Sequence, residues 1–115
     1  MPNQLTDGVT MTWLMDDAVQ PGAGLSLARM TIDPAVTSEP HRHSNCSEAI
    51  HLLSGKVDQR QDDSWVTLNA GDTILIPPDT VHQTRNIGAE TAVMMIAYSS
   101  GSRNYQVENG STGSE

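Results

Sequence analysis

The sequence has 115 residues, and its length, composition and charge exclude several classes of protein. A chain of this length forms one domain, because two domains would each be too small to bury a core unaided. The formal net charge of −8 argues against nucleic acid or an anionic membrane as a partner. Cys46 is the single cysteine, and neither a signal-peptide pattern nor an apolar run of about 18 residues occurs. We therefore expect a cytoplasmic protein without a membrane span or an internal disulfide.

Short apolar and alternating runs, separated by turn signals, predict an all-β chain. We expect strands at residues 10–14, 25–32, 41–43, 48–53, 57–61, 64–68, 73–76, 81–86 and 91–98. Residues 1–24 then form an N-terminal arm, loose over residues 1–7, together with the first strand, and residues 25–100 form a sandwich or barrel. Residues 101–115 are rich in Gly, Ser, Asn and Glu, which is typical of a disordered tail.

Three of the four histidines fall in one pattern with a glutamate. His41 and His43 are two residues apart, so both side chains lie on one face of an extended strand. Glu48 follows the polar run 44–47, and His82 lies 34 residues further along the chain. Three imidazoles and one carboxylate are a set that borderline divalent metals bind well. The predicted metal ligands are therefore His41, His43, Glu48 and His82.

The two segments that carry these residues resemble the paired signatures of the cupin superfamily. The first is His41-x-His43-x4-Glu48-x6-Gly55, and the second is Gly71-x5-Pro77-x-Asp79-x2-His82-x3-Asn86, with fifteen residues between the two glycines. The sequence departs from the family pattern at two turn positions, where Ala35 and Asp79 replace glycine. Asp tolerates left-handed backbone geometry better than most residues, whereas Ala35 fits less well there.

The resemblance implies a double-stranded β-helix, or jelly-roll, barrel that binds one divalent transition metal: Fe, Mn, Ni or Zn. We expect the strand of Glu48 to run back beside that of His41, and His82 to come from across the barrel. Four protein ligands on an octahedral ion would leave about two positions for a substrate. The resemblance, with the two-sided apolar strands 25–32 and 91–98, also predicts a homodimer.

The resemblance leaves the reaction open. A dioxygenase-like enzyme acting on a small oxygen-bearing metabolite is favoured, with Glu48 as the candidate catalytic base. The alternatives are a lyase or isomerase and a non-catalytic cupin that binds a small, sugar-like molecule. An enzyme requires a substrate-sized cavity with a polar group besides the ligands. With few aromatic residues in the chain, we expect that cavity to be small and aliphatic.

Four further residues near the motifs are predicted to have no part in metal binding. His51 lies three residues after Glu48, so on a strand it projects from the opposite face. Cys46 is more often a small buried residue than a ligand. Arg42, between two inward histidines, is expected to face outward, and Asn86 to make structural hydrogen bonds.

Overall fold

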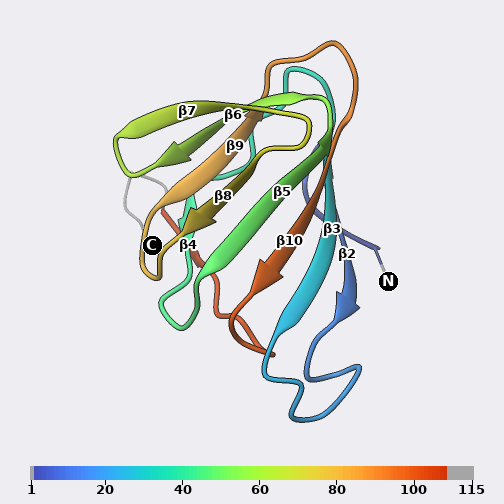
Figure 1. Cartoon of the computed structure of the whole chain (residues 1–115), viewed down its shortest axis with the longest axis vertical. Helices are drawn as coiled ribbons and strands as arrows, with labels where there is room; N and C mark the ends of the chain where they lie inside the picture. The colour runs from blue at the N-terminus through green and yellow to red at the C-terminus, as the bar shows by residue number, and fades with distance from the viewer. Residues whose placement is uncertain (1, 109–115) are drawn as a thin grey trace.

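In the computed structural model, the backbone is described for residues 2–108 and the side chains for residues 7–108, and every element is a β-strand (Figure 1). The first sheet has the order β1-β2-β3-β10-β5-β8, with strands at Pro2–Thr6, Val9–Met15, Ser26–Ile32, Ala92–Tyr98, Glu48–Ser54 and Thr73–Ile76. The second has the order β11-β4-β9-β6-β7, with strands at Gln106–Val107, His41–Arg42, His82–Asn86, Lys56–Gln61 and Ser64–Asn69. The two antiparallel sheets form an all-β jelly roll, as predicted. The part of the chain that the structure describes contains no helix that is long and apolar enough to cross a membrane.

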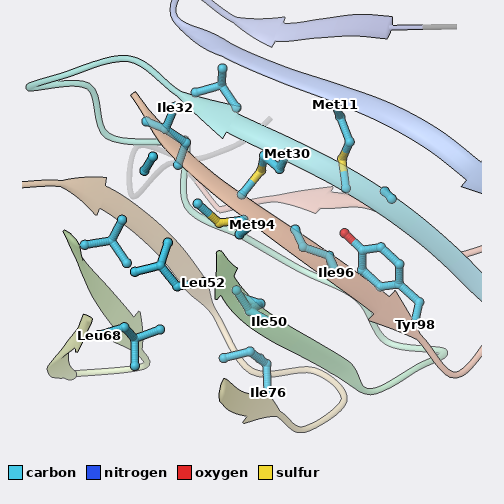
Figure 2. Packing of buried hydrophobic residues seen from close by; sticks show 14 of the residues in the cluster. Met11, Met30, Ile32, Ile50, Leu52, Leu68, Ile76, Met94, Ile96 and Tyr98 are labelled. Atoms are coloured by element: carbon cyan, nitrogen blue, oxygen red, sulfur yellow. The ribbon is translucent and has the colours of Figure 1, made fainter. Parts of the chain in front are cut away.

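The inner face of the first sheet supplies most of the apolar core. Burial alternates along β3 and β10, because successive side chains of a strand point to opposite faces. Figure 2 shows Met30 of β3 beside Met94 and Ile96 of β10, with Ile50 and Leu52 of β5 nearby. With no Phe in the chain, methionine and branched aliphatic side chains fill this space.

The inner face of the second sheet is partly polar, and three of its buried polar side chains are hydrogen-bonded. Gln59 and Thr84, both buried, share a hydrogen bond of 2.5 Å between the Thr84 hydroxyl and the Gln59 side-chain oxygen. Asn86 donates to the carbonyl oxygens of Ile32 (2.9 Å) and Glu90 (2.8 Å), which confirms its predicted structural role. Because these buried groups are satisfied, the polar wall costs little stability.

Each strand predicted between residues 10 and 98 is present, with ends that differ by at most one residue. The expectation for the N-terminus was wrong, since residues 2–6 form β1 and pair with β2. The prediction of a disordered tail is not met over residues 101–108, where β11 pairs with β4. Both segments are poor in apolar residues but are held by backbone pairing, which composition does not report. Residues 109–115 lie outside the described part of the chain.

The strands of the two motifs are arranged differently from the prediction. β4 and β9 are neighbours in the second sheet, with His41 directly opposite His82, so His82 does not come from across the barrel. β5 lies in the first sheet between β10 and β8, so Glu48 reaches the site from the opposite wall. The run 44–47 crosses between the sheets instead of turning back as a hairpin, and spacing alone does not distinguish these routes.

Both residues that replace glycine in the cupin pattern have left-handed backbone geometry, with φ of 66° at Ala35 and 64° at Asp79. An L-residue in this region costs about 1–2 kcal/mol, and Asp is tolerated better than Ala.

Exposed Ala35 therefore carries strain that Ala35→Gly relieves, and we expect a gain of about 1 kcal/mol in the free energy of unfolding. Chemical denaturation measures it. The matched control is Ala89→Gly, at an exposed turn position without positive φ, which should destabilise. Destabilisation of both variants would show that Ala35 is unstrained.

Candidate metal centre

The structure brings the four predicted ligands together at one end of the barrel. His41 lies on β4, His82 lies opposite it on β9, and His43 follows directly after β4. Glu48 is the first residue of β5 on the facing sheet. One ligand atom from each residue lies within 4.8 Å of all the others, a spacing that allows these residues to hold one metal ion. The sequence correctly predicted that these four residues lie together, although not the strands that bring them together, and their role as metal ligands stays a prediction.

Backbone carbonyls orient all three imidazoles. The Nδ1 atoms of His41 and His82 each lie 2.9 Å from the carbonyl oxygen two residues earlier. His43 Nδ1 lies 2.5 Å from the carbonyl oxygen of Asn104. A carbonyl only accepts hydrogen bonds, so each Nδ1 carries a proton, and each Nε2 is the ring nitrogen that faces the centre and can bind a metal. Metal-binding histidines in proteins are commonly held in this way.

Electrostatics at the centre favour a cation. Glu48 Oε1 lies 2.8 Å from His82 Nε2 and 3.1 Å from His43 Nε2, yet all three buried atoms lack a hydrogen bond of good geometry. Burial tends to raise the pKa of Glu48, but the two imidazoles outweigh it and lower the pKa. Burial and His82 lower the pKa of His41 to about 3, which keeps that ring neutral. Burial also opposes protonation of His82, but Glu48 raises its pKa. An ion at this point would satisfy the orphaned atoms, so the donor set fits a divalent metal.

The C-terminal segment, residues 101–108, completes the site, and the sequence did not predict this. Tyr105 stacks on His41, with ring centroids 4.5 Å apart and planes at 18°. Its hydroxyl donates to Glu39 Oε1 at 2.9 Å. Together with the Asn104 carbonyl on His43, these contacts place the segment against two of the four candidate ligands.

The polar run 44–47 fixes the C-terminal segment in place. The Asn104 backbone N–H donates to Asn45 Oδ1 at 3.0 Å, and Asn45 Nδ2 donates to the Ser102 carbonyl at 3.0 Å. The Ser44 N–H also donates to Asn104 Oδ1 at 2.8 Å. The one sequence signal for this contact is an asparagine at each end, which is too common to stand out.

The other residues near the motifs lie where the strand pattern places them. His51 is on the outer face of β5, and its Nδ1 lies 2.6 Å from Thr73 Oγ1. Cys46 is buried in the apolar core, and burial raises the pKa of its thiol. Arg42 points outward, 3.6 Å from Asp79 and 3.7 Å from Glu108. Among the described residues, the group that could hold a metal ion contains only the four candidate ligands.

A small cavity of about 20 Å³ adjoins the ligands. Its apolar wall includes Met11, Met30 and Ile96, as expected for an aliphatic pocket. The expectation was incomplete, because Tyr98 and Tyr105 also line the cavity. Aromatic residues are few in the sequence, but the fold brings these two to the cavity. Amino-acid composition alone does not show where residues lie in the folded chain.

Comparison with known proteins identifies the family. A family model described as "Cupin domain" matches residues 28–98, so the chain belongs to the cupin family. The C-terminal segment lies outside the match. The candidate ligands His41, His43, Glu48 and His82 lie within it.

Two curated relatives illustrate the similarity. An uncharacterized protein of Methanocaldococcus jannaschii, MJ1618, is 30% identical over 82 residues, which cover 71% of this chain and 66% of that protein. A germin-like protein of Morus alba is 31% identical over 84 residues, covering 69% of this chain and 40% of that protein. The chain therefore matches only part of each relative.

Solved structures agree on the fold. A structure of oxalate oxidase superposes with a TM-score of 0.81 at 26% identity, covering 91% of this chain and 58% of that one. A Lactobacillus farciminis oxalate decarboxylase in complex with formate gives a TM-score of 0.85 at 22% identity, covering 96% and 34% of the two chains. The latter similarity is evidence for the fold alone.

Proposed function

We propose that this chain is a metal-dependent cupin enzyme with one divalent transition metal bound by His41, His43, Glu48 and His82. The observation that carries the proposal is the convergence of three Nε2 atoms and one buried carboxylate on one point, with every imidazole oriented by a carbonyl. Fe, Mn, Ni and Zn all suit this donor set. The substrate is a small oxygen-bearing metabolite, and the likeness to oxalate oxidase supports this choice.

The chain's own residues have distinct tasks in this proposal. When bound, the metal supplies Lewis-acid polarisation of a substrate oxygen and a template on which reactants meet. The three histidines hold that template rigid through their carbonyl partners. Glu48 is the candidate proton acceptor, and the apolar wall excludes water from the reacting atoms. We favour dioxygenase-like chemistry, with a lyase or isomerase as the alternative within the same site.

A second candidate, a non-catalytic cupin that binds a small molecule, is favoured by one observation. The cavity of about 20 Å³ holds about one or two water molecules, which is less than the substrate-sized space that we expect in an enzyme. The two candidates share the metal and differ in turnover, so they are separated by kinetics and not by metal content.

Metal content tests the site that both candidates share. The parent protein, purified without chelator, is expected to hold about one divalent ion per chain by elemental analysis, and His82→Ala to lose it. The matched control is His51→Ala, which removes an imidazole from the outer face and should leave stoichiometry unchanged. Retention of metal by His82→Ala, or its loss from His51→Ala, would refute the ligand assignment.

Two features of the proposal rest on the sequence prediction. The homodimer is supported by the exposed outer face of the first sheet, where Leu27, Ala97, Ala49 and Leu75 form one row across four strands. Leu75, at one end of this row, is 61% exposed, so the row offers apolar surface that a second copy would cover. Cytoplasmic location remains a prediction from cysteine content.

A further inference from the structure

Arg103, in the C-terminal segment, separates the metal cavity from a second hollow. That outer hollow has a volume of about 330 Å³ and is lined by residues that include Trp13, Asp16 and Ser102. Of the described residues, Arg103 alone lines both spaces. A molecule that passes from the outer hollow to the candidate ligands therefore meets this guanidinium.

The guanidinium of Arg103 has no acidic partner among the described residues. It lies over three aromatic rings, 4.9 Å from the centroid of Trp13, 5.2 Å from that of Tyr98 and 4.9 Å from that of Tyr105. One terminal nitrogen lies 3.9 Å from Met11 Sδ, and the buried Nε has no hydrogen-bond partner. Ring faces stabilise the cation but accept no strong hydrogen bond, so N–H groups remain for a ligand.

The charges on the two sides of Arg103 select where an anion binds. On the outer side, Asp16 and Asp17 give the hollow a net negative charge. On the inner side, Glu39 and Glu48 line the cavity. With a divalent ion in place, the positive charges of the ion and Arg103 exceed the negative charges of these two carboxylates by one. Without the ion, the two carboxylates outweigh Arg103 and the cavity is negative. A singly charged anion is therefore favoured on the inner side, and only when metal is bound.

We propose that Arg103 is the specificity-determining residue that binds the carboxylate of a small monoanionic substrate at the metal site. This inference rests on the metal centre proposed above. The planar fork of arginine matches a carboxylate with two parallel hydrogen bonds, and the Nε in need of a partner belongs to that fork. The small cavity restricts the substrate to a few carbon atoms, and the flexible side chains of Met11 and Met30 in its wall can adapt to them.

The test measures binding of acetate, with acetamide as its neutral counterpart, by titration calorimetry at constant ionic strength. Metal-loaded parent protein is expected to bind acetate and not acetamide, and metal-free protein to bind neither. Arg103→Gln should keep its metal and bind acetate about 10- to 100-fold more weakly. By linkage, acetate should raise the metal affinity of the parent, and it should raise that of Arg103→Gln only at acetate concentrations about 10- to 100-fold higher.

The matched control is Arg85→Gln, which removes another arginine stacked on an aromatic ring, 4.4 Å from the Trp65 centroid and away from the cavity. It should bind acetate as the parent does. Arg103→Lys keeps the charge without the fork, and an intermediate affinity would support the proposal even where Arg103→Gln folds poorly. Equal acetate affinity in all variants, or no acetate binding by the metal-loaded parent, would overturn the proposed role of Arg103. Neither outcome would contradict the metal centre. Failure of the parent to bind metal would instead overturn the metal centre, and this inference with it.

Discussion

Replacing Glu48 by Gln is expected to reduce turnover by about 10²–10⁴-fold at matched metal occupancy. The carboxylate is buried and ionised, and its Oε1 faces two imidazoles. A neutral amide of the same shape can still coordinate weakly, but it cannot accept a proton. Part of the metal should therefore remain while most of the rate is lost. Steady-state kinetics on a substrate found by oxygen-consumption screening would measure the ratio.

The matched control for this comparison is Glu90→Gln, which makes the same change at an exposed turn outside the site and should leave the rate unaltered. Equal rates for the parent and Glu48→Gln would remove Glu48 from the mechanism. If the protein is a non-catalytic binder, no substrate turns over in the parent, and Glu48→Gln changes affinity only. The same pair of proteins thus separates the two candidate functions.

Ending the chain at Ser100 is expected to weaken metal binding about 10- to 100-fold. The deletion removes the Asn104 carbonyl that accepts the proton of His43 Nδ1 and the Tyr105 ring that stacks on His41. His43 then lacks the contact that fixes its tautomer, although all four candidate ligands are still present. Competition with a chelating indicator would measure the change in the metal dissociation constant.

Two further variants isolate this effect. Ending the chain at Glu108 removes none of the contacts described for the segment and should preserve the affinity. Asn45→Ala removes the hydrogen bonds to the Asn104 N–H and the Ser102 carbonyl without shortening the chain. It should lower the affinity in the same direction by a smaller factor. Unchanged affinity in the Ser100 truncation, with its circular dichroism intact, would show that the segment does not support the site.

The sequence predicted the strands and the four converging residues because both depend on local patterns. Alternation with period two marks a strand whatever its neighbours, and two histidines two residues apart share a face wherever the strand lies. Pairing between strands is not local. The order in the sheets places His82 beside His41 and Glu48 on the opposite wall, whereas spacing predicted the reverse. The four residues converge with either arrangement, so the sequence could predict that they lie together without predicting which strands bring them together.

The C-terminal segment shows where composition is a poor guide. Residues 101–108 contain little apolar surface, and on that basis the whole tail was expected to be disordered. Their order depends on asparagine side chains, a two-residue strand and the packing of Arg103 and Tyr105 against residues distant in sequence. No periodic pattern in the sequence indicates these contacts. The same segment lies outside the cupin family match, so neither sequence pattern nor family resemblance could reveal its contribution.

The most direct test of the metal centre is a crystal structure of the protein grown with a divalent transition metal, using anomalous scattering to locate the ion. We predict one strong anomalous peak about 2.0–2.3 Å from the Nε2 atoms of His41, His43 and His82 and from a carboxylate oxygen of Glu48. The Nδ1 atoms should keep their carbonyl partners. An ion bound elsewhere, such as at His51, or no peak among these four side chains at full metal loading, would contradict the account.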